Sequence, residues 1–192
     1  NTYTGTTSIT AGALGAGHNN AFGTSGILLR NGSLFAYGGD RTITNAITVN
    51  STTTAGTSTF IGDHSLSLTG NWTLANTTAG HVITNTLVSG KTLTIGGNLG
   101  FGALSGDATL TVNGTGETII NGNIVNSTGS NLALTYSGTG TLTLGGTNNH
   151  KGTTSVSGGG TLRLSGSGTL GTGALTVSNG TLEITGSVDP TV

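Results

Sequence analysis

Leucine recurs at a regular interval near the C-terminus of this chain, at Leu142, Leu162 and Leu182. Each of these leucines lies in a short segment in which apolar residues alternate with threonine or another polar residue. Alternation with a period of two places the apolar side chains on one face of a β-strand. Repeats of this length are typical of solenoids, in which each repeat forms one coil that stacks on the next. The spacing therefore predicts stacked β-coils in which these three leucines lie directly above one another.

Similar segments occur elsewhere in the chain, and glycine, asparagine and serine residues that favour turns lie between them. A second apolar position follows each leucine, at Val156 and then at Leu175 and Val177. Two or three strands in each interval between leucines predict an all-β fold, a parallel β-helix or β-solenoid. The clearest segments are residues 92–95, 109–112, 141–144, 161–164 and 181–184.

The leucines also give an estimate of the number of coils. The interval from Leu93 to Leu110 is shorter than the interval from Leu110 to Leu132, so we expect coils of variable length. We predict about nine or ten coils and a rod roughly 45 Å long at the spacing of neighbouring β-strands.

The composition agrees with an ordered β-chain. The 192 residues include 37 glycines, 41 threonines, 18 serines and 18 asparagines, whereas charged residues make up only 6% and the net charge is −1. So few helix-forming residues exclude a helix bundle, and a disordered chain would have lower hydrophobicity and higher net charge. Because no shift in composition precedes the last few residues, we predict one β-helical segment of a larger protein over 1–186 and a C-terminal extension or linker over 187–192.

One segment of the chain carries a family resemblance. Residues 138–164, GTGTLTLGGTNNHKGTTSVSGGGTLRL, resemble the passenger-associated transport repeat of bacterial autotransporters. His150 and Lys151 stand where this repeat usually has an aromatic residue and threonine, whereas Tyr3 occupies the aromatic position in the related residues 1–14. The resemblance implies a right-handed parallel β-helix that is exported through an outer-membrane pore and displayed on the bacterial surface.

One group of residues is a candidate for catalysis. The step from Asp40-Arg41 to Asp63-His64 is close to one coil, so the two carboxylates could stack as an acid/base pair of a polysaccharide-degrading enzyme. The alternative is that both aspartates cap turns through bonds to the backbone. Carboxylates also suit calcium, but there is no Asp-rich turn or nonapeptide repeat, and we expect neither a metal site nor a cofactor.

Threonine-rich strands raise the possibility of ice binding. Thr-x-Thr occurs at residues 92–94, 109–111 and 141–143, and we expect these threonines to face outward in one grid. Arg163 and Glu183 would interrupt that grid in the following coils. Since they are separated by the same interval as the leucines, we expect them to lie on neighbouring strands and to form a surface ion pair.

The aromatic residues and the histidines could each have a binding role or a purely structural one. Trp72, Phe101 and Tyr136 could be sugar-stacking platforms, but we expect them to fill the core or cap turns. The histidines are too scattered for metal-ligand spacing, and we expect them to be solvated in loops; they are His18, His64, His81 and His150.

We therefore expect a non-enzymatic structural segment, without catalytic residues, of a secreted or surface-displayed bacterial protein. An uncharged rod has little repulsion against copies of itself, so self-association, lateral or end to end, is the expected partnership, with surface carbohydrate as a second possibility. The near-neutral charge argues against nucleic acid, and the lack of a long apolar run argues against membrane insertion. A polysaccharide-degrading or carbohydrate-binding β-helix and an ice-binding solenoid are the alternatives.

Overall fold

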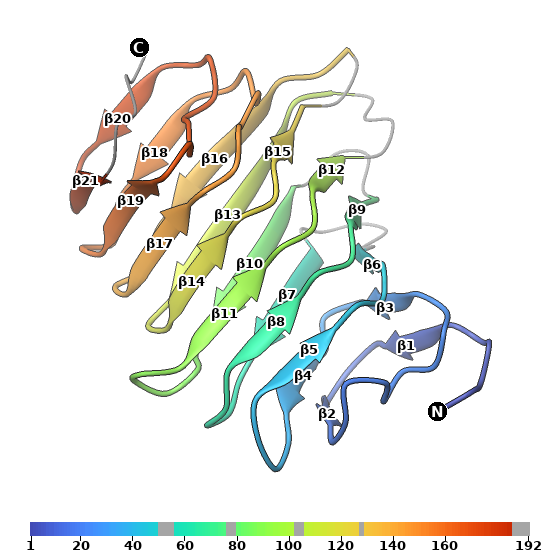
Figure 1. Cartoon of the computed structure of the whole chain (residues 1–192). Coiled ribbons are helices and arrows are strands. Elements are labelled where there is room, and N and C mark those ends of the chain that lie inside the picture. Colours follow the sequence, from blue (N-terminus) through green and yellow to red (C-terminus); the bar gives the residue numbers. More distant parts are fainter. Residues whose placement is uncertain (50–55, 76–79, 102–105, 127–128, 186–192) are drawn as a thin grey trace.

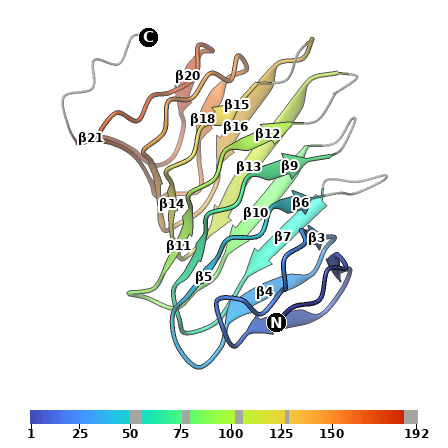
Figure 2. The same cartoon turned by 45° about the vertical axis from the view of Figure 1, so that its right-hand side comes forward.

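The computed structural model describes residues 1–49, 56–75, 80–101, 106–126 and 129–185. These residues form 21 strands and no helix, and the coils stack from the N-terminus at one end to the C-terminus at the other (Figure 1 and Figure 2). Among them, therefore, no helix is long and apolar enough to cross a bilayer. The predicted all-β parallel solenoid is confirmed, and the predicted extension at 187–192 lies outside the described residues.

The strands form three parallel sheets, and each sheet is one side of the solenoid. Sheet A contains β1 (Thr7–Ile9), β3 (Ile27–Leu29), β6 (Ile47–Val49), β9 (Trp72–Leu74), β12 (Leu99–Phe101) and β15 (Ile124–Val125). Sheet B contains β2 (Ala13–Ala16), β4 (Ser33–Ala36), β7 (Gly56–Phe60), β10 (His81–Asn85), β13 (Ala108–Gly114), β16 (Leu132–Tyr136), β18 (Thr154–Val156) and β20 (Leu175–Val177). Sheet C contains β5 (Arg41–Ile43), β8 (Leu66–Leu68), β11 (Thr92–Ile95), β14 (Glu117–Ile120), β17 (Thr141–Leu144), β19 (Thr161–Ser165) and β21 (Thr181–Thr185).

Each central coil passes through sheets A, B and C in turn, as β9, β10 and β11 do. Glu117 pairs with Thr141 on the next coil, and His81 pairs with Leu110, so the coil that starts at His81 is the longer of the two. The chain makes about seven turns rather than nine or ten, because the eight strands of sheet B are seven steps apart from first to last. At the spacing of β-strands the solenoid is about 35 Å long, shorter than the length of roughly 45 Å that we predicted.

The error in the coil number comes from Leu93 and Leu110, which do not lie above one another. Leu93 is in sheet C and pairs with Thr118, whereas Leu110 is in sheet B and pairs with Leu134. The interval between the two leucines therefore covers only the part of a coil that leads from sheet C through sheet A to sheet B.

The coils nearest the C-terminus have the predicted length. Leu142 pairs with Leu162, and Leu162 pairs with Leu182, which confirms the predicted column of leucines. The strands from β16 to β21 all belong to sheets B and C. On the third side the backbone continues without a strand, and the Asn149 N–H donates to the carbonyl oxygen of Ile124 at 3.1 Å. These C-terminal coils thus give up a strand of sheet A and keep the contact between coils.

Inward-facing side chains form the core, which runs along the whole solenoid. Leu142 and Leu162 are completely buried, as are most of the aliphatic residues that alternate along the strands. Burial of one such side chain contributes about 1.5–3 kcal/mol, so the columns supply the main driving force for stacking. The central coils also enclose Phe60 and Trp72, whose ring centroids are 6.1 Å apart.

Glycine and asparagine stack at the corner between sheets C and A. A Cβ atom on Gly97 would lie 2.0 Å from the carbonyl oxygen of Gly70, so a side chain at this level would push two coils apart. Beside them, Asn71 Oδ1 accepts the N–H of Asn98 at 3.0 Å, and Asn98 Oδ1 accepts that of Asn123 at 2.9 Å. The asparagine side chains thus satisfy backbone groups where the chain turns.

Candidate functional site

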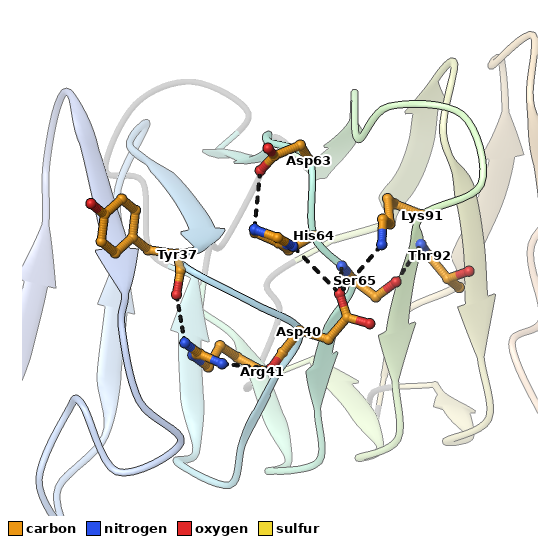
Figure 3. Close-up of polar contacts among 8 residues, drawn as sticks. All are labelled: Tyr37, Asp40, Arg41, Asp63, His64, Ser65, Lys91 and Thr92. Carbon is orange, nitrogen blue, oxygen red and sulfur yellow. Dashed lines mark hydrogen bonds and ion pairs between the residues drawn. The ribbon is translucent and has the colours of Figure 1, made fainter.

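The predicted aspartates and His64 lie together at the corner where the chain enters sheet C (Figure 3). Asp40 precedes β5, and Asp63 and His64 precede β8. Lys91, which precedes β11, joins them from the next coil. We refer to Asp40, Asp63, His64 and Lys91 as the corner cluster. Sequence reasoning did not include Lys91, because its place depends on coils that are longer than the leucine interval.

Asp40 is the centre of the corner cluster. Its Oδ1 accepts the backbone N–H of Ser65 at 2.8 Å, and it lies 3.7 Å from Lys91 Nζ and 3.8 Å from His64 Nδ1. The hydrogen bond from Ser65 is the main cause that lowers the pKa of Asp40; burial, the next largest effect, opposes it, and the neighbouring Lys91 and His64 lower the pKa further. Asp40 is therefore an ionised turn cap at neutral pH.

The two carboxylates do not stack as the sequence spacing suggested. The register pairs Arg41 with Leu66, so one coil brings Ser65, and neither Asp63 nor His64, level with Asp40. Asp63 precedes Ser65 in the chain and so lies before the level of Asp40. His64 lies between the two aspartates, and its Nε2 is 3.6 Å from Asp63 Oδ1 (Figure 3). The geometry therefore shows a carboxylate–imidazole–carboxylate chain at the surface instead of a pair of facing carboxylates.

Arg41 holds the turn that precedes it and points away from both carboxylates. Its Nη2 donates to the carbonyl oxygen of Tyr37 at 2.7 Å, and its Nη1 donates to that of Asp40 at 2.9 Å (Figure 3). Gly38 and Gly39 in this turn have positive φ angles of 66° and 145°, which a glycine adopts without strain. Arg41 therefore acts as a brace for the turn.

Capping by side chains continues on the next coil. Ser65 Oγ accepts the N–H of Thr92 at 3.2 Å, just as Asp40 accepts the N–H of Ser65. The turn-capping alternative for Asp40 thus describes the contacts that the structure shows. Short polar side chains bonded to nearby backbone groups favour such corners.

An open groove of about 700 Å³ begins beside the corner cluster. Lys91, Glu117 and Arg163 line it, together with residues 86–90 and Thr141. No pattern in the sequence pointed to this groove, because its walls come from several coils whose lengths differ. Arg163 is not free to meet a ligand there, since its Nη2 and Nε lie 2.9 and 3.0 Å from Glu183 Oε2. That contact confirms the predicted ion pair.

Two of the three aromatic residues that could have been sugar platforms are inside the molecule. Trp72 and Tyr136 are each 2% exposed, and the partly buried Phe101 packs against the core with its ring centroid 5.6 Å from that of His81. The expected core-filling role is therefore confirmed for Trp72 and Tyr136, and the sugar-platform possibility is wrong for them. The most exposed aromatic residue of the described part is Tyr37, which sequence reasoning did not single out.

The histidines divide into two groups. His18 is exposed and His64 is partly exposed, as expected for loops, whereas His81 and His150 are 1% and 0% exposed. The prediction was wrong for these two: His81 shares the inward parity of Ile83 along β10, and His150 lies between β17 and β18 with its Nε2 2.8 Å from the buried hydroxyl of Thr154. Burial lowers the pKa of His81 and of His150 to about 4.

The predicted single grid of threonines is wrong. Residues 92–94 and 141–143 lie in sheet C, but residues 109–111 lie in sheet B. On sheet C, β14 separates the first two segments and carries Glu117 and Ile119 at the matching positions. Thr-x-Thr segments that look alike in sequence thus belong to two different sides of the solenoid.

Among the described residues, no three His, Cys, Asp or Glu side chains lie close enough together to hold a metal ion. Comparisons of the chain with family models, curated proteins and solved structures find no match. The function must therefore be inferred from the residues and their geometry.

Proposed function

We propose that this chain is a non-enzymatic structural segment of a secreted or surface-displayed bacterial protein of the autotransporter type. In this role it serves as a β-helical scaffold in adhesion, self-association or fibre formation. The resemblance of residues 138–164 to the transport repeat supports the protein class. The fold supports a scaffold because each coil contacts its neighbours, so that structure can propagate from coil to coil without an external energy source.

The observation that carries self-association is the last coil. Val177 and Ile184 are 44% and 40% exposed, whereas Val156 and Leu164, with which they pair on the preceding coil, are completely buried. Val177 and Ile184 therefore occupy core positions that a further coil, of this chain or of a second copy, would cover. Apolar side chains exposed at core positions of a coil can form an interaction surface.

The polarity of the strands decides how a second copy can add. Among the described strands, β20 is the last of sheet B and β2 is the first, so within this part of the chain each has one edge that no other strand pairs with. Because the sheet is parallel, β2 of one copy can pair with β20 of another without reversing direction. Such a head-to-tail contact does not close on itself, and it leads to a fibre.

The corner cluster supports a scaffold more than a polysaccharide-degrading enzyme. A general acid needs a proton near neutral pH, but the lowered pKa of Asp40 leaves it ionised. Its Oδ1 already accepts the N–H of Ser65. We expect no turnover on a broad panel of polysaccharides, and turnover that Asp40→Asn abolishes would contradict this part of the proposal.

Sedimentation velocity and electron microscopy over a range of concentrations test the assembly. We expect the native chain to form filaments, and Ile184→Lys to remain monomeric because a lysine cannot be buried between two coils. Ile119→Lys is the matched control: it makes the same change at an outward position of β14 in the middle of the solenoid and should assemble like the native chain. A native chain that stays monomeric at every concentration, or Ile184→Lys filaments, would overturn the proposal.

A further inference from the structure

The outward side of sheet B carries side chains in straight rows. The first row contains one residue from each of six consecutive strands of the sheet, and the second row lies one outward position further along. The first row consists of Thr57, Val82, Thr111, Thr135, Ser155 and Thr176. The second row consists of Ser33, Thr59, Thr84 and Asn113. We call these two rows the hydroxyl face, because all but Val82 and Asn113 carry a hydroxyl group.

The hydroxyl face carries no charge. None of the eight described strands of sheet B contains Asp, Glu, Lys or Arg. The charged residues Arg163 and Glu183, which were expected to interrupt the threonines, lie in sheet C on another side of the solenoid. The two charged residues therefore do not interrupt the threonines of sheet B, and the regular hydroxyl-rich surface lies on that sheet.

Buried side chains on the inner side of sheet B hold the two rows in place. Leu110, Val112 and Leu134, which flank row residues along β13 and β16, are completely buried in the core. β-Branched side chains such as threonine also have a restricted χ1 angle, so their hydroxyl and methyl groups keep a fixed direction. The rows are therefore rigid: each threonine presents a hydroxyl and a methyl group in a fixed direction and each serine a hydroxyl alone, and Val82 and Asn113 interrupt the repeat.

The two spacings of the hydroxyl face are set by β-geometry. Neighbouring strands are about 4.8 Å apart, and alternate residues along one strand are about 6.7 Å apart. A ligand that follows both spacings repeats in two dimensions, is neutral, and accepts and donates hydrogen bonds. The oxygen lattice of an ice surface has this chemistry, whereas an ionic ligand would find no counter-charge here.

We propose that the hydroxyl face of sheet B is an ice-binding surface. Bound water molecules that bridge the hydroxyl groups and lie over the methyl groups match the lattice, and the protein then stays on the growing crystal. This activity is separate from assembly, since the hydroxyl face lies along the side of the solenoid and Ile184 lies at its end.

Thermal hysteresis, ice recrystallisation and partition of the protein into slowly grown ice test the proposal. We expect the native chain to be enriched in the ice and to inhibit recrystallisation. Thr111→Lys/Thr135→Lys should lose at least about tenfold in both, because unpaired charges in the centre of the face must be desolvated. Ser67→Lys/Thr94→Lys, which places two lysines on neighbouring strands of sheet C, is the matched control and should retain the native activity. Circular dichroism and thermal unfolding confirm that each variant folds.

The outcomes separate ice binding from its alternatives. A native chain that partitions into ice no better than Thr111→Lys/Thr135→Lys overturns the proposal. If that double variant instead abolishes filament formation while ice partition is absent throughout, the hydroxyl face is a contact between copies. Ile184→Lys should keep ice binding, so that a failure of the assembly proposal leaves this test intact.

Discussion

Sheets B and C both contribute buried apolar columns to the core and differ in what they show to solvent. Both contribute columns of buried leucine and other apolar residues, such as Leu134 in sheet B and Leu142 in sheet C. The described strands of sheet B carry no charged residue, whereas those of sheet C include Arg41, Glu117 and Arg163. The inner columns and the strand pairing thus determine the fold, and outward positions are free to take on different surface chemistry.

The two sheets also place their titratable groups differently. In sheet B, His81 and Tyr136 face inward, and burial lowers the pKa of His81 to about 4 and raises that of Tyr136 to about 12. At the entrance to sheet C, Asp40 and Lys91 lie at the surface and meet as an ion pair. The stability of the solenoid should therefore depend on pH in two separate ranges, one for each sheet.

The largest effect should come from the shared inner columns. Leu134→Ala and Leu142→Ala each remove a completely buried side chain, and each should lower the free energy of unfolding by about 2–5 kcal/mol. Urea unfolding measures this loss. Thr135→Ala, on the outward side of β16, is the control and should change stability by less than about 0.5 kcal/mol. A full effect in one sheet and none in the other would show that the two interiors are not equivalent.

The next effect belongs to sheet B. The pKa of His81 is about 4 in the folded chain, whereas its ordinary value, which applies to the unfolded chain, is 6.5. Between these two pH values the unfolded chain therefore binds more protons than the folded chain. Stability should therefore fall by up to about 3 kcal/mol as the pH decreases from about 6.5 to 4, and then level off with respect to this group. His81→Leu should remove this share of the pH dependence, as measured by urea unfolding at each pH.

His18→Leu is the control for that experiment, since it removes an exposed imidazole in place of a buried one. His150 is buried with the same lowered pKa, so the profile of His81→Leu should keep a slope that the His81→Leu/His150→Leu variant loses. A native profile that is flat over this range would contradict the buried positions of both imidazoles.

A smaller effect belongs to the entrance of sheet C. The pKa of Asp40 is lowered, so its contribution is present above the ordinary aspartate pKa of 3.8 and is lost as the pH falls further. Asp40→Asn should reduce the acid sensitivity in that lower range and leave the histidine range unchanged. Asp63→Asn, which changes a carboxylate that contacts His64, is the comparison and should have the weaker effect. If the two substitutions had equal effects, the hydrogen bond from Ser65 to Asp40 would not be the contact that sets the acid sensitivity.

The smallest effect should come from the ion pair on sheet C. Arg163 and Glu183 are 34% and 40% exposed, and such surface pairs contribute less than about 1 kcal/mol. A double-mutant cycle with Arg163→Gln and Glu183→Gln isolates the interaction energy, which should decrease further in high salt. A coupling energy well above this value would mean that the pair is shielded from solvent.

The sequence was sufficient for the fold because the leucine interval recurs unchanged where the coils are regular. It was not sufficient for the number of coils, since Leu93 and Leu110 have the same surroundings in sequence but belong to sheets C and B. Strand type is local, whereas membership of a sheet depends on the lengths of all the turns between strands.

The candidate site could be predicted in part, where it depends on local spacing, and not where it depends on the lengths of several coils. The spacing brought Asp40-Arg41 and Asp63-His64 to one corner, as predicted, but the levels of Asp63 and Lys91 depend on coils that are longer than the leucine interval and differ from each other. The inward position of His81 had a local signal in its alternation with Ile83 along β10. The hydroxyl face had none, because its rows combine strands from coils of different lengths.

The straightness of the first row of the hydroxyl face is the most direct test of the account. The chain contains no cysteine, so spin labels can be attached at Thr57→Cys and Thr176→Cys alone. These positions are five coils apart in one row, and electron paramagnetic resonance should give a narrow distance distribution centred at about 24 Å. A broad distribution, or one centred far above this value, would contradict both the stacking register and the surface built on it.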